Sequence, residues 1–223
     1  MKINRFAGLL ALSTLGFAAM SPAAHAQTNG SFENPALTNP GDYTTNSIPD
    51  WTFTGNLQTY AYGVYRPTTT DFTTSIPDGV QAAYVSQGGA IYQDQATTLA
   101  AKTQYDLSFF VGSRERQPGA GTVYLETSGG NILAQTSLTP TAGTFVGDTL
   151  QFVAGTGNPY LGETLRIVLA DASGSQVSFD NIKLTERIAP TSTAPEGSSI
   201  LLLFGGMAPF GLGLLSRRRS RKS

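Results

Sequence analysis

Cysteine is absent from the 223-residue chain, and the only histidine is His25, close to the N-terminus. A chain without cysteine forms no disulfide and offers no thiolate as a nucleophile or a metal ligand. Without histidine, the rest of the chain cannot form a Ser-His or Cys-His catalytic pair or an imidazole metal site. Carboxylate chemistry and oxygen-bound cations therefore remain.

Positive charge is scarce between residues 27 and 190. This segment has seven Lys and Arg against fourteen Asp and Glu, a net charge of −7, whereas the whole chain has −1. Nucleic acids and anionic lipids are bound by basic surfaces. We therefore expect neither of them to be a partner of this segment.

A sustained helical period is also missing from residues 27–187. Short β-branched and aromatic runs alternate with turn clusters, which is typical of an all-β domain. Alternate residues from Tyr105 to Val111 are apolar and should share one strand face, and Trp51 should lie in the core. The pattern predicts a jelly-roll β-sandwich. We expect strands near residues 29–33, 50–54, 57–62, 80–86, 90–95, 104–112, 122–127, 132–136, 144–153, 164–170 and 176–185.

The N-terminus has the three zones of a secretory signal peptide. Lys2 and Arg5 precede an apolar run over residues 6–20, and Ala24-His25-Ala26 is a small-residue cleavage site. A transmembrane helix is the alternative, but the run is shorter than the ~20 residues that a span needs. We expect export through the Sec translocon and cleavage by signal peptidase after Ala26.

A second apolar run covers residues 200–215, within a predicted transmembrane span of residues 198–216 that is followed by Arg217, Arg218 and Arg219. At ~1.5 Å per residue its length is about that of the ~30 Å hydrocarbon core. Because basic residues stay on the cytoplasmic side, this span would leave the preceding domain outside. A buried core helix with a basic end is the alternative.

Pro195-Glu196-Gly197, the apolar span and the Arg run together resemble the PEP-CTERM sorting tail of Gram-negative bacteria, although that family usually has a second proline at the position of Gly197. The resemblance implies that the membrane protease exosortase removes the tail. The precursor would be anchored in the inner membrane and the mature form would reach the cell surface or the extracellular matrix. The expected order is a signal peptide (1–26), a β-sandwich (27–187), a linker (188–194) and the sorting tail (195–223).

Three short motifs resemble the galactose-binding-like jelly rolls that include many carbohydrate-binding modules. They are Asn29-Gly30-Ser31-Phe32-Glu33, Ile48-Pro49-Asp50-Trp51 and Phe179-Asp180-Asn181-Ile182-Lys183-Leu184. The resemblance implies that the first and last strands are neighbours. It also implies a structural calcium ion where they meet, with Glu33 and Asp180 as ligands.

The strand at 176–185 has an irregular apolar pattern. Val177 and Phe179 have one parity and Ile182 and Leu184 have the other, so a regular strand cannot bury all four. We therefore predict a bulge at residues 180–181, which would free backbone groups for a cation. Calcium takes six to eight oxygen ligands, and the alternative is that the two carboxylates only cap a turn and face solvent.

Aromatic residues gather between residues 60 and 72, in what we expect to be an ordered loop. Tyr65 could stack on a sugar ring while Arg66 bonds its hydroxyls, or the rings could simply pack on the sandwich end. Arg114 follows a strong strand and should lie in a solvated loop. If it lay beside Tyr65, it would join the same ligand-binding site.

Two classes of function are compatible with these features. The favoured hypothesis is a non-enzymatic surface or extracellular-matrix protein that binds carbohydrate or is purely structural. The alternative is a glycosidase or polysaccharide lyase that uses two carboxylates, although no pair of acidic residues has a recognisable spacing.

Overall fold

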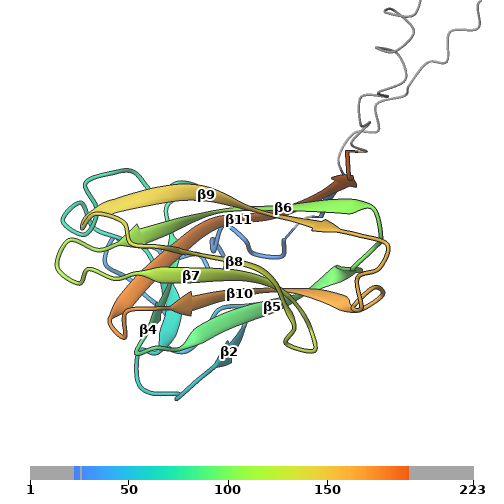
Figure 1. Cartoon of the computed structure of the whole chain (residues 1–223). Coiled ribbons are helices and arrows are strands. Elements are labelled where there is room, and N and C mark those ends of the chain that lie inside the picture. The colour runs from blue at the N-terminus through green and yellow to red at the C-terminus, as the bar shows by residue number, and fades with distance from the viewer. Residues whose placement is uncertain (1–22, 26, 191–223) are drawn as a thin grey trace, which may run out of the picture. The chain divides into compact units, whose positions relative to one another are not determined.

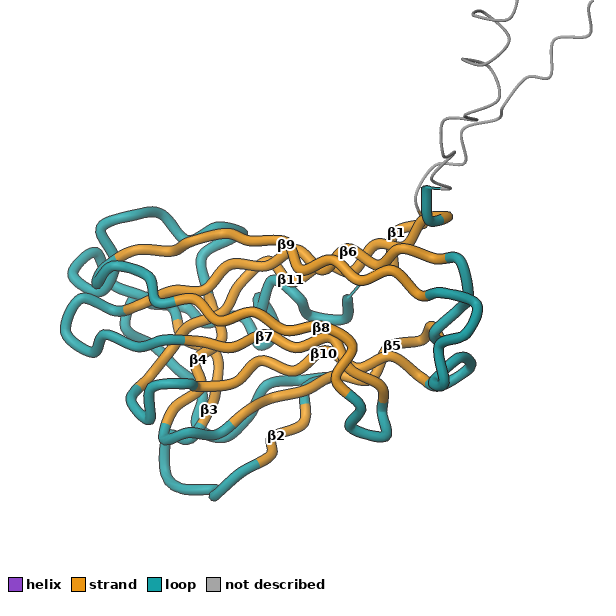
Figure 2. Tube along the Cα trace, viewed as in Figure 1, coloured by secondary structure: helices purple, strands orange, loops and turns teal. Residues whose placement is uncertain are grey.

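The computed structural model describes residues 23–25 and 27–190 of the chain. These residues form two antiparallel sheets that pack face to face, without any helix (Figures 1 and 2). The predicted all-β sandwich is confirmed, and the arrangement is jelly-roll-like. No helix of the described part is long and apolar enough to cross a membrane. The predicted span at 198–216 and nearly all of the signal peptide lie outside the described residues.

One layer is a six-stranded sheet in the order β3-β4-β11-β6-β9, with β1 also paired to β11. Its strands are β1 (Ala23–His25), β3 (Tyr62–Tyr65), β4 (Ala82–Ser86), β6 (Thr103–Ser113), β9 (Thr144–Ala154) and β11 (Gln176–Ile188). The other layer is a five-stranded sheet in the order β2-β5-β10-β7-β8. Its strands are β2 (Thr52–Thr54), β5 (Ala90–Thr98), β7 (Gly121–Thr127), β8 (Ile132–Leu138) and β10 (Thr164–Asp171).

Two of the expected strands are wrong. Residues 29–33 form a turn in which Asn29 and Phe32 have positive φ angles of 53° and 56°, so the backbone cannot be extended there. The strand expected at 57–62 starts only at Tyr62, because residues 59–61 form a turn in which Tyr60 has a positive φ angle of 64°. β3 therefore occupies part of the segment that we expected to be a loop.

The core lies between the two sheets and follows the predicted alternation. In β6, Tyr105, Leu107, Phe109 and Val111 are at most 1% exposed. Trp51 is 6% exposed and is part of the same core cluster. Burial of such large side chains is the main favourable contribution to folding.

The predicted bulge in β11 is confirmed. The pairing of β11 with β6 shifts register between Asp180 and Lys183, and Asn181 has a φ angle of 50°. The shift moves the strand by one residue, so the apolar side chains on both sides of it face the core. All four are at most 3% exposed: Val177, Phe179, Ile182 and Leu184.

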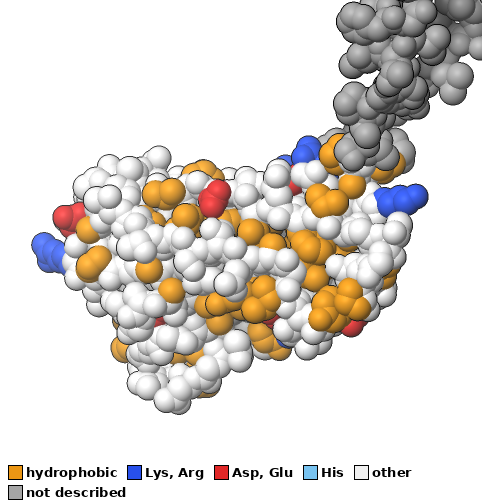
Figure 3. All heavy atoms as spheres, viewed as in Figure 1, with side chains coloured by type: hydrophobic (Ala, Val, Ile, Leu, Met, Phe, Trp, Pro, Cys, Tyr) orange, Lys and Arg blue, Asp and Glu red, His pale blue; other side chains and the backbone are white. Residues whose placement is uncertain are grey.

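Charged side chains are few on the molecular face drawn in Figure 3. Apolar side chains on this face are interspersed with neutral polar ones. Only 13% of the residues of the chain are charged. A charged ligand would therefore find little electrostatic attraction on this face.

Candidate functional site

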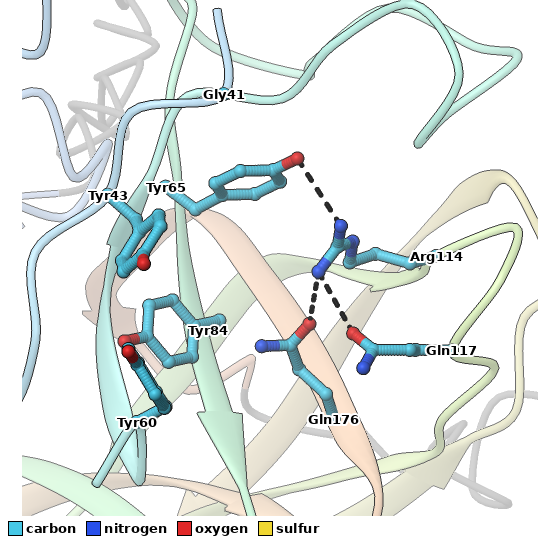
Figure 4. Close-up of a pocket in the computed structure, with 8 residues that line it drawn as sticks. All are labelled: Gly41, Tyr43, Tyr60, Tyr65, Tyr84, Arg114, Gln117 and Gln176. Carbon is cyan, nitrogen blue, oxygen red and sulfur yellow. Dashed lines mark hydrogen bonds between the residues drawn. The ribbon is translucent and has the colours of Figure 1, made fainter.

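A pocket of about 380 Å³ lies where β3 and β4 meet the first residues of β11 and the loop after β6 (Figure 4). It is lined by Gly41, Tyr43, Tyr60, Tyr65, Tyr84, Arg114, Gln117 and Gln176. Four of these eight residues are tyrosines, and the polar groups converge on one wall. Aromatic walls with a few placed polar groups, in this range of volume, are typical of a site for a small organic molecule.

Tyr65 and Tyr84 are the inner tyrosines of the pocket, and strand alternation places both on the outer face of the six-stranded sheet. Val64 faces the core, so its neighbours in β3, Gly63 and Tyr65, face outward. Tyr84 of β4 pairs with Gly63 and lies across it. A Cβ atom on residue 63 would be 2.7 Å from the Tyr84 ring and 2.3 Å from the carbonyl oxygen of Thr44. Only glycine therefore lets this ring lie on β3.

Arg114 holds the polar wall together with Asp71 and Tyr65. Its Nη2 atom is 2.6 Å from Oδ1 of Asp71, and its guanidinium carbon lies 4.7 Å from the centre of the Tyr65 ring. The Tyr65 hydroxyl donates a hydrogen bond to the other carboxylate oxygen of Asp71. The three side chains thus fix one another by an ion pair, a cation–π contact and a charge-assisted hydrogen bond.

The protonation states of this wall follow from the same contacts. Burial alone would raise the pKa of Asp71, but hydrogen bonds from Thr68, Tyr65 and Arg114 outweigh burial and hold that pKa well below its usual range. Burial, together with the hydrogen bond to Asp71, raises the pKa of Tyr65 to about 12. At neutral pH Asp71 is ionised and neutralises Arg114, while Tyr65 keeps its proton.

Two glutamines complete the polar wall (Figure 4). Nη1 of Arg114 donates to Oε1 of Gln117 at 3.0 Å and to Oε1 of Gln176 at 2.8 Å. A guanidinium group has no acceptor, so each amide must turn its oxygen towards Arg114 and its NH₂ group away. Nε of Arg114 is itself buried and has no hydrogen-bond partner among the described residues.

Tyr43 and Tyr60 form the outer rim of the pocket. Their ring centres are 5.7 Å apart in an edge-to-face arrangement, and both side chains are about half exposed. Tyr84 lies beneath them and is 1% exposed, and its hydroxyl donates to the carbonyl oxygen of Thr44 at 2.7 Å. The pocket is therefore open at an aromatic rim and closed by a buried ring.

Of the three predicted ligand-binding residues, the fold brings Tyr65 and Arg114 together. Arg114 is not simply solvated, because its side chain is 23% exposed and packs on Tyr65. Arg66 does not belong to the pocket lining. Its Nη1 atom donates to the carbonyl oxygens of Leu37 and Thr38 at 2.9 and 2.7 Å, so it fixes a neighbouring loop.

Sequence reasoning missed Tyr43, Tyr84, Asp71 and the two glutamines. Tyr84 had a detectable signal, since it is a large aromatic residue at the outward parity of a strand whose neighbours are alanine and valine. Asp71, Gln117 and Gln176 had none. They come from separate loops or from a strand end, and only the tertiary fold brings them around Arg114.

Glu33 and Asp180, the predicted calcium ligands, both hold the segment 78–81. Oε1 of Glu33 accepts hydrogen bonds from two backbone N–H groups of this segment, each at 2.8 Å. Oδ2 of Asp180 accepts one from Asp78, also at 2.8 Å. Over residues 23–25 and 27–190, no three His, Cys, Asp or Glu side chains form a group that could hold a metal ion.

Asp180 is a buried carboxyl on the same sheet face as the pocket. It is fully buried and pairs with Phe110 of β6. The pairing of β11 with β4 reaches Phe179 and Ala83, so Asp180 and Ala82 are the next residues in this register. Ala82 in turn pairs with Tyr65 of β3. The segment 78–81 covers Asp180, which does not line the pocket.

The environment of Asp180 favours its protonated form. Burial raises the pKa of this carboxyl to about 8. Hydrogen bonds from the N–H groups of Asp78 and Asn181 oppose the rise, and the charges of Asp78 and Glu33 add to it. A carboxyl that keeps its proton at neutral pH can act as a general acid towards a substrate that reaches it.

A second groove, of about 430 Å³, lies on the outer face of the five-stranded sheet. In it, Arg166 stacks on Tyr92 at 4.1 Å and forms two hydrogen bonds with Asp94, at 2.6 and 3.0 Å. Tyr124 also lines this groove. This groove also combines tyrosine and arginine side chains, but it lies on the other sheet and is remote from the first pocket.

The family model that matches the chain and four similar solved structures are of cyclases. The HpiC1-like family model, described as HpiC1 cyclase, matches residues 24–185. The Stig cyclase Fisc from Fischerella sp. TAU, in complex with (3Z)-3-(1-methyl-2-pyrrolidinylidene)-3H-indole, aligns over 76% of this chain and 100% of its own, with 24% identity and a TM-score of 0.70. A cyclase from Fischerella sp. TAU in complex with 4-(1H-indol-3-yl)butan-2-one aligns over the same shares, with 25% identity and a TM-score of 0.68. No curated protein matches the chain.

These findings overturn the functional expectation from the sequence. The hypothesis of a non-enzymatic, carbohydrate-binding or structural surface protein is wrong, because the matching family is one of cyclases. Identification as a PEP-CTERM sorting protein with a carbohydrate-binding-module-like domain is likewise corrected: the match covers the sandwich, and no comparison supports the sorting tail. The short motifs at 29–33 and 179–184 are features of the sandwich and do not specify a ligand. Since the family model covers more than half of its residues, the chain belongs to the HpiC1-like cyclase family.

Proposed function

We propose that this protein is an enzyme that closes a ring in a small molecule with a flat aromatic group, bound in the tyrosine-lined pocket. The observation that carries this proposal is the cluster of Tyr65, Arg114 and Asp71 at the wall of a 380 Å³ pocket, inside the region matched by the cyclase family. Both cyclases from Fischerella sp. TAU named above hold an indole-containing ligand. An indole-type substrate is therefore the class that we propose.

The tyrosines would bind and orient the aromatic group of the substrate. Tyr43 and Tyr60 at the rim offer an edge and a face to a flat ring, and Tyr84 closes the pocket beneath them. Aromatic rings also stabilise positive charge that develops in a neighbouring molecule. This is the charge that forms when an electron-rich substrate is protonated before ring closure.

Asp180 is our candidate for the proton donor. It would transfer its proton to a carbon of the substrate, a new carbon–carbon bond would then close the ring, and loss of a proton to the Asp180 carboxylate would restore the acid. The reaction is an isomerisation, so it needs no oxidant or second reactant. Because the segment 78–81 covers Asp180, proton transfer requires the substrate to reach beneath this segment.

The binding proposal is tested with 4-(1H-indol-3-yl)butan-2-one and the purified protein by isothermal titration calorimetry. Tyr60→Ala should weaken binding several-fold, because it removes one aromatic wall, and should leave the melting temperature nearly unchanged since Tyr60 is 49% exposed. Tyr124→Ala, in the groove of the opposite sheet, is the matched control and should bind normally. Equal losses in the two variants, or no binding by the wild-type protein, would contradict the proposal.

A calcium ion between Glu33 and Asp180 is a second use of the same carboxylates. It is supported by their convergence on the segment 78–81 and by the like charge of Asp78, which a cation would offset. A cation that binds only the folded state would stabilise it by about 2.7 kcal/mol at a hundredfold excess over Kd. A chelator should then lower the melting temperature by several degrees, and Glu33→Gln should abolish that response. If the chelator leaves the melting temperature unchanged, the calcium proposal is wrong and Asp180 remains available as an acid.

We also propose that the protein is exported. The proposal is supported by the basic, apolar and small-residue zones of residues 1–26. Expression in a Gram-negative host and N-terminal sequencing of the extracytoplasmic fraction should give a mature protein that begins at Gln27. A protein found only in the cytoplasm with its first 26 residues intact would contradict export.

A further inference from the structure

The hydrogen-bond donors of the polar wall indicate which polar group a ligand of this pocket carries in addition to its flat aromatic ring. This inference rests on the proposed function of the pocket. The inner tyrosines are not available as donors, because the hydroxyl of Tyr65 donates to Asp71 and that of Tyr84 donates to Thr44. The charge of Arg114 is neutralised by Asp71. A ligand that reaches this wall therefore meets neither a free cation nor a free phenolic proton.

The amides of Gln117 and Gln176 are different. Both oxygens accept from Nη1 of Arg114, and because the guanidinium group cannot accept a hydrogen bond, neither amide can be flipped. Both NH₂ groups are thus oriented away from Arg114, and no described residue accepts a hydrogen bond from them. Gln176 is half-buried, so its NH₂ group loses hydration when a ligand fills the pocket and then needs an acceptor from that ligand.

We propose that the substrate carries a neutral hydrogen-bond acceptor of the carbonyl class, and that the NH₂ groups of Gln176 and Gln117 bind it. A neutral acceptor fits because the Arg114–Asp71 pair leaves no net charge at this wall. Arg114 acts as a positioning residue: it fixes which end of each amide faces the pocket. The aromatic rim and the amide wall together select a molecule with a flat ring at one end and a carbonyl oxygen at the other.

The test compares two probes that differ by one oxygen atom. 4-(1H-indol-3-yl)butan-2-one carries a ketone, and 3-butylindole has the same skeleton without it. One hydrogen bond contributes about 0.5–1.5 kcal/mol, so the ketone should bind the wild-type protein roughly three- to tenfold more tightly than 3-butylindole. Isothermal titration calorimetry measures both affinities.

Gln176→Glu is the decisive variant. It keeps an oxygen for Arg114 but replaces the NH₂ donor by an acceptor, so it should remove the preference for the ketone and leave binding of 3-butylindole nearly unchanged. Gln117→Glu should act in the same direction but less strongly, because Gln117 is more exposed. Gln135→Glu adds the same charge on the exposed side of β8 and is the control for charge alone. Melting curves confirm that each variant is folded.

The outcomes separate this inference from the proposed function. If the wild-type protein binds both probes equally, or if Gln176→Glu weakens both equally, the carbonyl inference is wrong and the aromatic pocket stands. If the wild-type protein binds neither probe, the aromatic pocket and the carbonyl inference both fail.

Discussion

At the scale of single residues, the site depends on a few side chains whose charge states are set by their neighbours. Asp71 is kept ionised by Thr68, Tyr65 and Arg114, whereas burial keeps Asp180 protonated. Asp71 lies in the loop after β3, and Asp180 lies in β11. The difference follows from their partners: one faces a guanidinium group, and the other faces two carboxylates and only neutral donors.

Replacement of Asp71 should loosen the polar wall. In Asp71→Asn the amide can present its oxygen either to Thr68 and Tyr65 or to Arg114, and its NH₂ group then meets a donor on the other side. We expect a loss of about 1–3 kcal/mol in the free energy of unfolding, measured by urea denaturation. Asp148→Asn, at an exposed position of β9, should change stability by less than about 0.5 kcal/mol. A loss of similar size in both variants would show that the Asp71 contacts contribute little.

The raised pKa of Asp180 predicts a pH dependence of opposite sign to that of a paired carboxylate. The pKa of this residue is about 8 in the folded protein against an ordinary value of 3.8. Between these pH values the folded state holds one proton more than the unfolded state, so the free energy of unfolding falls as the pH rises from about 4 to about 8 and then levels off. Urea denaturation at several pH values in a calcium-free buffer should show this fall.

Asp180→Asn should remove that component of the pH dependence, because the amide does not titrate. Its stability relative to wild type should therefore be more favourable at pH 8 than at pH 5. If the two proteins have the same pH profile, Asp180 does not hold a proton in the folded state. A wild-type profile that becomes flat when calcium is added would instead assign the carboxylate to the cation.

At the scale of elements, β11 carries both a residue of the pocket wall and the candidate proton donor. Its first residue, Gln176, lines the pocket, and Asp180 faces the same side by regular alternation with the core residue Phe179. The bulge that follows returns Ile182 to the core. The apolar pattern predicts this bulge because a strand side chain cannot change face without an extra residue. The partners of β11 are not predicted by any local pattern.

The bulge requires a residue that tolerates a positive φ angle. Asn181 has a φ angle of 50°, which asparagine and glycine adopt readily and β-branched residues do not. Asn181→Val should therefore lower the free energy of unfolding by about 1–2 kcal/mol, whereas Asn181→Gly should be nearly neutral. Chemical denaturation of the two variants decides this. A valine variant as stable as the wild-type protein would mean that β11 can adopt a regular register.

At the scale of the whole molecule, the sandwich is completed by residues after the expected cleavage site. β1 contributes only Ala23–His25 to the edge of β11. Gln27, which would be the first residue of the proposed mature form, accepts a hydrogen bond from the N–H group of Leu184 at 2.8 Å. Among the described residues, the core cluster begins at Phe32. Loss of β1 should therefore affect stability little.

A protein that begins at Gln27 should thus fold and melt close to the form that includes residues 23–26. We expect a difference below about 4 °C, corresponding to roughly 1 kcal/mol for a domain of this size. Differential scanning calorimetry of the two forms measures it. If the shorter form does not fold, β1 is essential, and cleavage after Ala26 cannot give a stable mature protein.

The sequence by itself determined the all-β class, the buried faces of strands such as 105–111, the core position of Trp51 and the bulge at 180–181. These follow from parity and period, which depend only on neighbours along the chain. The tertiary structure decided the pocket, because Asp71, Gln117 and Gln176 meet Arg114 only after distant strands pair. It also moved Arg66 away from the site and buried Asp180 beneath the segment 78–81. Function was misjudged for the same reason: the short motifs at the two ends of the domain describe a sandwich, and a site formed by long-range contacts has no local sequence signal.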